Sequence, residues 1–180
     1  MCSSDLIKGG RIDLESALEK CADCDAVLIA VGSDDRHDSV VQALSNTSDV
    51  CFERVQVQPG SACAFAASMG KPHCAFPVSA TLEAFETLVR PVVLRRLGRT
   101  DAKRPSVAAE ITRPLQLDPG YSHCIKAVTT YDDGKYSCVA LGGRPSGARP
   151  WSLPNSLILI PPNVDTVRKG EIVEAILLTT

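Results

Sequence analysis

The chain has 180 residues, of which 44% are hydrophobic and 22% are charged, and its formal net charge is −2. This composition predicts a soluble globular protein with material for two modest cores and argues against a nucleic-acid-binding protein. The longest apolar runs, Ala26–Val31 and Leu157–Ile160, are too short to cross a membrane. The first residues also lack the organisation of a signal peptide, so we expect a cytoplasmic protein.

The N-terminal region is predicted to form a helix, a strand and a second helix start. Asp13 can cap a short helix with one apolar face, and the run Ala26–Val31 has the composition of a buried strand. Between Ser33 and Asp38 the sequence then offers a capping hydroxyl and acidic side chains for a first helical turn. An α/β arrangement is therefore expected from the beginning of the chain.

Residues 57–98 are predicted to form a turn, two short strands and a long helix. Pro59-Gly60 is the turn, and the strands are Ala62–Ala66 and His73–Phe76. Ser79 offers an N-cap oxygen to the helix that follows. Backbone N–H groups at such a helix start can hold an anion, although an ordinary strand-to-helix corner has the same pattern.

Downstream, the pattern changes to short strands separated by turns at Asp118-Pro119-Gly120 and Asp132-Asp133-Gly134. Helical spacing stops at the charged stretch Arg99–Pro105, which is a predicted linker. Several short strands with such turns indicate a small all-β barrel. The strand-like runs are Val107–Leu115, Cys124–Tyr131, Tyr136–Leu141, Ser156–Ile160 and Ile172–Leu178.

The cysteines and histidines do not predict a metal site. Eight cysteines without a secretion signal are expected to be reduced thiols. The close pair Cys21-x-x-Cys24 lacks the second pair or the histidines that a zinc site needs, and it ends a helix, which argues against a thioredoxin-like role. The three histidines, His37, His73 and His123, are scattered singly.

Four short motifs follow one another between residues 58 and 98. They are Gln58-Pro59-Gly60-Ser61-Ala62, Gly70-Lys71-Pro72, Phe76-Pro77-Val78-Ser79-Ala80 and Arg90-Pro91-Val92-Val93-Leu94-Arg95-Arg96-Leu97-Gly98. They resemble K-P-G-K-P, G-K-P, L-P-G-N-P-V-S-A and R-P-x-L-R-x-L-x-G of the molybdopterin molybdenumtransferase family, which includes the MoeA proteins and the E domain of gephyrin. Order and spacing match apart from a deletion of the G-N-P triplet, and the resemblance extends over nearly the whole chain.

The resemblance implies an α/β fold with a truncated three-layer αβα, molybdopterin-binding-like domain at residues 1–98. A linker at 99–105 and a C-terminal β-barrel domain at 106–180 follow. The similarity begins partway through the family's αβα domain, and the family builds its active site at a dimer interface that includes the absent N-terminal half. We expect either a fragment or a shortened relative, with a homodimer or the missing half as its partner.

The resemblance also implies a chemistry, because family enzymes join molybdate to the dithiolene of an adenylated molybdopterin with the help of Mg²⁺. In the family the oxyanion is held by two lysines, an arginine and two serines. The lysine positions are Gln58 and Ser61 in this chain, the arginine position is His123, and the serines are Ser79 and Ser146.

Further positions follow the family's ligand site. Ser33 and Asp38 match a serine and an acid of a glycine-rich motif, and Pro59 and Gly60 match the turn between the two lysines. Asp38 is the candidate catalytic residue, because it keeps the family's acid in place. The expected cofactor-binding residues are Ser33, Pro59, Gly60, Ser61, Ser79, His123 and Ser146, and no metal ligand is expected.

Two of the family's hydroxyls, those of Ser79 and Ser146, thus remain, whereas its three fixed cations do not. Hydrogen bonds to charged partners contribute roughly 1.5–3 kcal/mol each, so their loss would weaken oxyanion binding by roughly 4–9 kcal/mol. We expect a protein of molybdenum cofactor biosynthesis that is catalytically silent as an isolated chain, unless Arg144 or Arg149 replaces the lost charge. The alternatives are a non-catalytic binding or scaffold module of the gephyrin type and an unrelated two-domain α/β protein.

Overall fold

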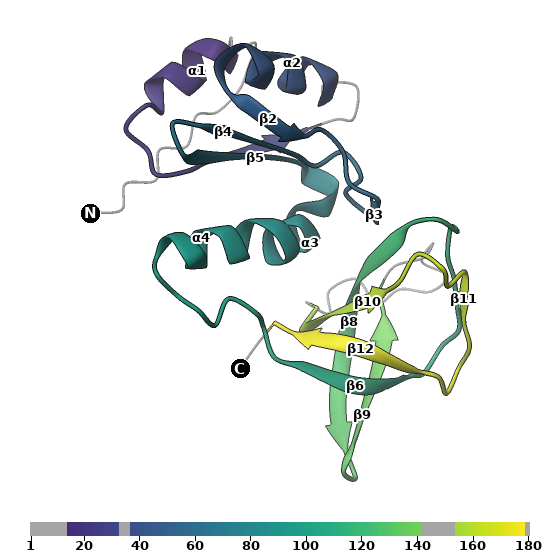
Figure 1. The fold of residues 1–180 in the computed structure, drawn as a ribbon. Helices are drawn as coiled ribbons and strands as arrows, with labels where there is room; N and C mark the ends of the chain where they lie inside the picture. Colours follow the sequence, from purple (N-terminus) through teal and green to yellow (C-terminus); the bar gives the residue numbers. More distant parts are fainter. Residues whose placement is uncertain (1–13, 33–36, 142–153, 179–180) are drawn as a thin grey trace. The chain divides into compact units, whose positions relative to one another are not determined.

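The computed structural model describes residues 14–32, 37–141 and 154–178 (Figure 1). Its elements, in chain order, are α1 (Leu14–Lys20), β1 (Val27–Val31), α2 (His37–Thr47), β2 (Asp49–Phe52), β3 (Val57–Gln58), β4 (Ala64–Ser68), β5 (Lys71–Pro77), the 3₁₀ turn η2 (Val78–Ala80), α3 (Thr81–Ala84), the π-helical turn η3 (Phe85–Val89), α4 (Arg90–Arg96), β6 (Ser106–Ile111), β7 (Leu115–Gln116), β8 (Ser122–Asp132), β9 (Lys135–Ala140), β10 (Ser156–Ile160), β11 (Thr166–Val167) and β12 (Ile172–Leu177). Contacts divide the chain into two compact units, Met1–Val55 with Ala62–Val78, and Gln56–Ser61 with Ser79–Thr180.

The first unit is a mixed four-stranded sheet in the order β1-β5-β4-β2, with α1 and α2 packed against it. Strand β1 runs parallel to β5, whereas the β5–β4 and β4–β2 pairs are antiparallel. The helices contribute apolar side chains one turn apart, as an amphipathic helix must when one face is buried. The core consists of Leu18, Val31, Val41, Leu44, Ala64, Ala66 and Ala75.

The second unit contains a closed five-stranded barrel. Its strands follow the order β10-β12-β6-β9-β8, and an antiparallel pairing of β8 with β10 closes the ring. The predicted mixed α/β fold with a β-barrel is thereby confirmed, whereas the three-layer αβα arrangement and the domain limits at residues 98 and 105 stay predictions. The barrel is filled by small and branched side chains, namely Ala109, Ile111, Ala127, Cys138, Ile158, Ile160, Val167, Val173 and Ala175.

One helical stretch, formed by α3, η3 and α4, continues from residue 81 to 96. Its π-helical turn immediately precedes α4, whose first turn contains Pro91. Because proline has no N–H group, the wider turn before it lets the helix continue without a regular bond at that position. The cap predicted at Ser79 is wrong, since α3 starts after Ala80 without a side-chain cap, and Ser79 lies in the 3₁₀ turn η2.

Strand boundaries follow local backbone chemistry. Strand β10 occupies the predicted residues 156–160, whereas the predicted strand 107–115 is wrong as one element and is divided into β6 and β7. Pro114 between them cannot donate to a ladder, which explains the interruption. Gly98 has a φ of 74°, and its N–H donates to the carbonyl oxygen of Arg95, so the predicted glycine stop of the helix is confirmed.

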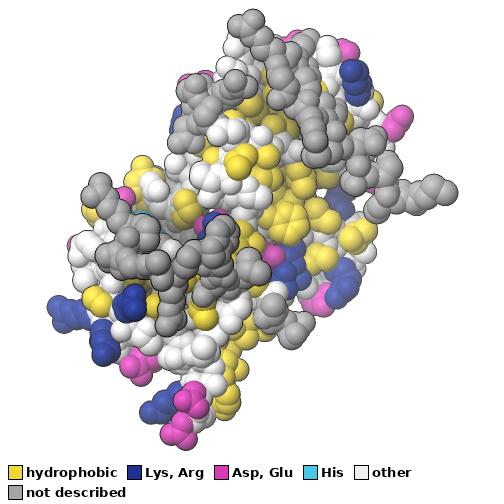
Figure 2. Space-filling view, turned by 180° about the vertical axis from the view of Figure 1, so that it is seen from behind, with side chains coloured by type: hydrophobic (Ala, Val, Ile, Leu, Met, Phe, Trp, Pro, Cys, Tyr) yellow, Lys and Arg dark blue, Asp and Glu magenta, His cyan; other side chains and the backbone are white. Residues whose placement is uncertain are grey.

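The described surface carries charges of both signs. On the face that Figure 2 shows, basic side chains in dark blue are interspersed with acidic ones in magenta. This mixture fits the net charge of −2. Among the helices of residues 14–32, 37–141 and 154–178, none has the length and apolar character needed to span a membrane.

The barrel core generates a stability prediction. Ile158 on β10 is fully buried, whereas Ile172 at the start of β12 is 65% exposed. Replacement Ile158→Ala should lower the free energy of unfolding by roughly 2–5 kcal/mol, because it removes buried contacts and leaves a cavity. Ile172→Ala is the matched control and should change it by less than about 0.5 kcal/mol. Urea denaturation followed by circular dichroism measures both, and equal effects would contradict the assigned core.

A second prediction concerns His73 on β5. Burial, and secondly the charge of Lys71, lower the pKa of His73 below its ordinary value of about 6.5. His73 therefore binds a proton more readily in the unfolded state than in the folded state. The free energy of unfolding keeps its full value above about pH 6.5 and decreases as the pH falls below it. Oγ of Ser48 and Nδ1 of His73 share a hydrogen bond of 2.9 Å, which Asn can replace.

We expect His73→Asn to flatten this pH dependence. The measurement is hydrogen exchange of the amides in β4 and β5 at pH 5.5 and 7.5. Exchange in the wild-type chain should be faster at pH 5.5 than the intrinsic chemistry of exchange accounts for, and the variant should lack this excess. An unchanged excess in His73→Asn would assign the acid sensitivity to another group.

Candidate functional site

The predicted site residues fall into three groups. Pro59, Gly60, Ser61, Ser79 and His123 all belong to the second unit. Asp38 belongs to the first unit, at the start of α2. The remaining predicted residues, together with the two arginines proposed as replacements, lie outside the described residues; these are Ser33, Ser146, Arg144 and Arg149.

The turn at Pro59-Gly60 is held at the beginning of β8. Strand β3 runs parallel to β8, with Gln58 aligned with His123. The N–H of Ser122 donates to the carbonyl oxygen of Gln56 at 3.0 Å, which fixes the entry to the turn. The Gln58–Pro59 peptide is cis, and Gly60 has a φ of 107°, a conformation that side chains with a Cβ rarely adopt.

This pairing explains why the Gln56–Ser61 segment leaves its neighbours in sequence and joins the barrel. Its backbone groups find partners on β8 rather than on the sheet of the first unit. Two of the three positions where the resemblance expects cations, Gln58 and His123, are thereby brought side by side. The third position, Ser61, follows directly in the same segment and is half-buried.

His123 is locked in place rather than presented to solvent. Its side chain is buried, at 7% exposure, and its Nε2–H donates to the carbonyl oxygen of Asp118 at 2.9 Å. The carbonyl can only accept, so this nitrogen carries the proton and is not available to a bound anion. The imidazole therefore does not act as a surrogate for an exposed guanidinium.

Ser79 and Asp38 are both accessible but differ in charge environment. Ser79 lies in η2, directly before α3, and its side chain is exposed. Asp38 forms an ion pair with Arg54, with 3.2 Å between Oδ1 and Nη2, and both side chains are largely exposed. Such a pair contributes little to stability, so Arg54 can release the carboxylate to another partner at little cost.

His37, the first residue of α2, is buried beside this pair. Its Nε2–H donates to the carbonyl oxygen of Glu53 at 2.8 Å. Its Nδ1 is buried without a hydrogen-bond partner. The ring thus anchors the start of α2 to the segment after β2, and this role was not apparent from a single histidine in the sequence.

A buried carboxylate facing β8 was also missed by sequence reasoning. Glu83 of α3 is 3% exposed, and its Oε1 lies 3.2 Å from Nζ of Lys126. Its Oε2 is buried without a hydrogen-bond partner. Burial, and secondly the charge of Glu83, raise the pKa of the Cys124 thiol to about 12, so this thiol stays protonated.

The sequence contained only a weak indication of the cluster formed by Glu83, Cys124 and Lys126. Cys124 and Lys126 are two residues apart on a strand and therefore share one face. Glu83 occupies a helical position between apolar neighbours, where a charge is rarely buried without a partner. Neither pattern identifies the other side of the pair, which only the tertiary structure supplies.

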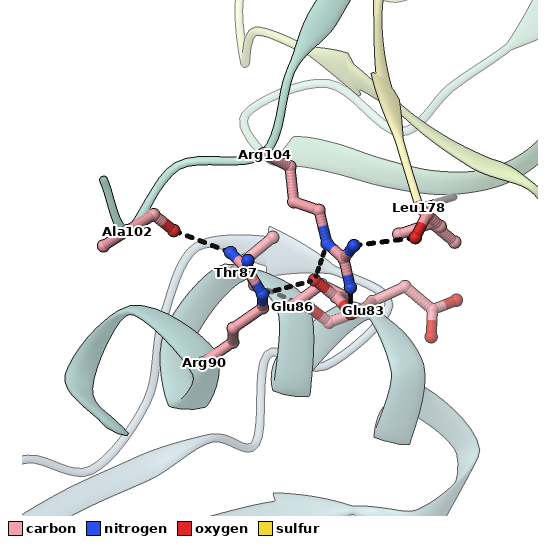
Figure 3. Close-up of polar contacts among 7 residues, drawn as sticks. All are labelled: Glu83, Glu86, Thr87, Arg90, Ala102, Arg104 and Leu178. Atoms are coloured by element: carbon pink, nitrogen blue, oxygen red, sulfur yellow. Dashed lines mark hydrogen bonds and ion pairs between the residues drawn. The ribbon is translucent and has the colours of Figure 1, made fainter. Parts of the chain in front are cut away.

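A second ionic cluster, drawn in Figure 3, joins the helix to both ends of the barrel sequence. Arg104 donates from Nε and Nη2 to the two carboxylate oxygens of Glu86 at 2.9 and 2.8 Å, and from Nη1 to the carbonyl oxygen of Leu178 at 2.7 Å. Arg90 adds an ion pair with Glu86 at 3.8 Å and a hydrogen bond to the carbonyl oxygen of Ala102 at 2.7 Å. The bidentate contact between Arg104 and Glu86 fixes the orientation of both side chains as well as pairing their charges.

The charges around the start of β8 are therefore largely neutralised. Gln58 and Ser61 carry none, His123 is committed to a carbonyl, and the ammonium of Lys126 is paired with Glu83. What the described residues of this site offer to a ligand is a set of hydroxyl, amide and backbone donors. Such donors bind polar groups with modest net free energy, about 0.5–1.5 kcal/mol each.

Comparison with known proteins identifies the class of protein to which this barrel with its attached helix belongs. Residues 108–178 match the family model described as MoeA C-terminal region (domain IV). Molybdopterin molybdenumtransferase 1 of Mycobacterium tuberculosis is 31% identical over 154 residues, which cover 78% of this chain and 35% of that protein. The chain thus belongs to the MoeA family and corresponds to the C-terminal part of its members.

Solved structures agree on the fold. The molybdopterin biosynthesis MoeA protein from Pyrococcus horikosii aligns with a TM-score of 0.73 and 23% identity, covering 93% of this chain and 41% of that one. A molybdenum cofactor biosynthesis protein from Pyrococcus furiosus aligns with a TM-score of 0.65 and 19% identity, covering 91% and 53%. The chain spans about a third to a half of the length of these relatives.

The ionic cluster generates a prediction about the second unit. Arg104→Ala should lower the free energy of unfolding by about 1–3 kcal/mol, because it leaves the mostly buried Glu86 carboxylate without its bidentate partner. Arg104→Lys should recover only part of the loss, since an ammonium cannot reproduce the fork. Arg99→Ala, which breaks the exposed pair with Asp101, is the control and should leave stability unchanged. Chemical denaturation distinguishes these outcomes, and equal effects at residues 104 and 99 would contradict the clamp.

Proposed function

We propose that this chain is a molybdenum cofactor biosynthesis protein that retains the pterin-binding side of a MoeA-type site and does not bind molybdate tightly enough to transfer it alone. The observation that carries the proposal is the state of the three positions where the resemblance expects cations. All three lie in one unit; Gln58 and Ser61 are uncharged side chains, and His123 is buried with its Nε2–H committed to the Asp118 carbonyl oxygen.

Electrostatics makes this loss decisive for molybdate. A doubly negative oxyanion leaves water only when fixed positive charges or many aligned donors replace its hydration. The ammonium of Lys126 is already paired with the carboxylate of Glu83 at 3.2 Å, so it adds little net positive potential at the start of β8. Each hydrogen bond from a charged donor contributes roughly 1.5–3 kcal/mol to binding. Neutral donors in place of three charged ones therefore weaken the free energy of molybdate binding by several kcal/mol.

A pterin with a nucleotide tail makes different demands. Its rings and sugars can use the amide of Gln58, the hydroxyls of Ser61 and Ser79, and the backbone of the turn at Gly60. These groups belong to the second unit, and Gly60 allows close approach because it has no Cβ. The proposed ligand is therefore the adenylated molybdopterin itself, with molybdate as the substrate that the isolated chain binds poorly.

The proposal assigns no magnesium-binding role to the described residues of the chain. The described residues contain no group of three or more His, Cys, Asp or Glu side chains that could hold a metal ion. Asp38 offers one exposed carboxylate, paired with Arg54. Because Mg²⁺ needs several oxygen ligands in a near-octahedral arrangement, the described residues do not fit it by themselves, and no step is assigned to it.

A non-catalytic binding module is the second candidate. The pairing of Lys126 with Glu83 favours it, because the carboxylate cancels the positive charge of an ammonium that could otherwise attract an anion. This candidate predicts that neither molybdate nor the adenylated pterin binds to the purified chain. Calorimetry with both ligands separates the two candidates, since the first requires binding of the pterin.

Restoring charge tests the electrostatic explanation directly. The double variant Gln58→Lys with Ser61→Lys should tighten molybdate binding at least tenfold, because each new charged hydrogen bond contributes roughly 1.5–3 kcal/mol. Isothermal titration with molybdate measures the change. Titration of the unaltered chain with the adenylated pterin, in the same experiment, tests whether the pterin binds.

A charge-matched control excludes a general effect of two added lysines. Gln116→Lys with Ser106→Lys makes the same substitutions at exposed positions on β7 and β6. This control should leave molybdate binding unchanged. Submillimolar molybdate affinity of the unaltered chain would overturn the inactive assignment, and an equal gain in both double variants would show that the Gln58 and Ser61 positions are not special.

A further inference from the structure

The turn between α1 and β1 contains the close pair Cys21-x-x-Cys24, which is not part of the candidate ligand site (Figure 1). Both side chains are partly exposed thiols. The N–H of Cys24 donates to the carbonyl oxygen of Cys21 at 2.9 Å, so the two cysteines are the first and fourth residues of a hydrogen-bonded turn. The pair therefore lies within the first unit and is defined by local backbone geometry.

The geometry of this turn suits a disulfide. The Cα atoms of the first and fourth residues of such a turn lie within about 7 Å of each other, and a disulfide usually spans about 4.4–6.8 Å between them. The preceding bonds follow the same spacing, because the N–H of Cys21 donates to the carbonyl oxygen of Leu18 and that of Ala22 to Glu19. In backbone of this 3₁₀ type, side chains three residues apart lie on the same side. The two sulfur atoms can therefore meet with little movement of the chain.

The turn is also anchored to the rest of the first unit. Lys71, the first residue of β5, donates a hydrogen bond from Nζ to the carbonyl oxygen of Ala22, which lies between the two cysteines. Helix α1 ends directly before the turn, and β1 begins at Val27 shortly after it. Because the backbone of the turn is already ordered, closing a bond across it costs little further conformational entropy.

The other cysteines of the described residues are less suited to such a bond. Four of them are buried, namely Cys63, Cys74, Cys124 and Cys138. Burial raises the pKa of these thiols, to about 12 for Cys124 and to about 11 for the others. They stay protonated, and the thiolate is the form that exchanges with a disulfide. Cys51 is exposed on β2, but the next cysteine along the chain is buried.

The position of the pair after α1 decides the kind of chemistry. Thiols at the start of a helix are activated, because the helix N-terminus stabilises the thiolate. Cys21 instead follows Lys20, the last residue of α1, so the pair lacks this activation. It is therefore suited to being oxidised and reduced by small thiol compounds and not to catalysing disulfide exchange in other proteins.

We propose that Cys21 and Cys24 are a redox modification site that forms a reversible disulfide, with a low-molecular-weight disulfide as the oxidant. The thiolate of one cysteine attacks the small disulfide, which forms a mixed disulfide and releases one small thiol. The thiolate of the other cysteine attacks the protein sulfur of the mixed disulfide, closes the Cys21–Cys24 bond and releases the second small thiol. The protein loses two hydrogen atoms and the small disulfide gains them. Disulfides in reducing compartments are usually of this transient, redox-sensing kind.

The test equilibrates the full chain with glutathione buffers in which the oxidised form increases at a constant concentration of about 1 mM reduced glutathione. The remaining thiols are then blocked, and the peptides are mapped by mass spectrometry. We expect a peptide in which Cys21 and Cys24 are joined. Because the second step is intramolecular, half-oxidation of this pair should need at least tenfold less oxidised glutathione than the mixed disulfide at Cys51. Excess reduced glutathione should reopen the bond.

Variants separate a paired bond from ordinary thiol reactivity. Cys24→Ser should abolish the bond and leave Cys21 to form a mixed disulfide at the oxidant concentrations that modify Cys51. Cys51→Ser is the matched control, because it removes an exposed thiol and should leave formation of the Cys21–Cys24 bond unchanged. Circular dichroism of each variant verifies that the chain is folded.

Three results would overturn the proposal. One is recovery of Cys21 and Cys24 only as thiols or as separate mixed disulfides in buffers that modify Cys51. Another is a disulfide that joins two chains in place of the two cysteines of one chain. The third is a bond that excess reduced glutathione does not reopen. Because these readouts involve neither pterin nor molybdate, their failure is distinct from a failure of the proposed function.

Discussion

Strand β8 is the element on which the second unit depends, because its backbone is hydrogen-bonded along both edges. At 11 residues it is the longest of the described strands, and it pairs with β9 and with β10, the second of which closes the barrel. Its first residues also accept β3 as a parallel neighbour, and Lys126 on the same strand receives Glu83 from α3. The turn at Pro59-Gly60, the start of α3 and the barrel all contact this one strand. Strand β8 therefore fixes where the candidate ligand groups lie.

The fold was readable from the sequence where periodicity was long and uninterrupted. Strand β10 and the glycine stop at Gly98 were predicted correctly, since an apolar run and a positive-φ glycine are local signals. The two-residue strands β3, β7 and β11 were not, because their pairing depends on partners far along the chain. Ser79 was wrongly predicted as the helix cap, because a hydroxyl before an apolar run does not distinguish a 3₁₀ turn from a capped α-helix.

The sequence named the residues of the candidate site, whose role stays a prediction, but it did not reveal the surroundings that decide their charges. The motif order identified Gln58, Ser61 and His123, which the structure assigns to one unit. Burial of His123 and its hydrogen bond to the Asp118 carbonyl follow from tertiary packing, and they give its imidazole a structural role. Burial of Glu83 was not predicted either. A carboxylate that is buried can be recognised only once the ammonium that pairs with it is known, and tertiary packing supplies that partner. Loss of charge at such a site alters affinity for an oxyanion far more than it alters the fold.

The passage of residues 56–61 into the barrel has a consequence for how this protein can be divided. Neither unit is a continuous piece of polypeptide, because the chain enters the second unit at Gln56, leaves it after Ser61 and returns at Ser79. No single cut separates the two. A piece beginning at residue 106 would lack β3, Arg104 and the helix whose Glu83 pairs with Lys126. A barrel excised by a single cut at residue 106 therefore loses backbone and ionic partners that it has in the intact chain.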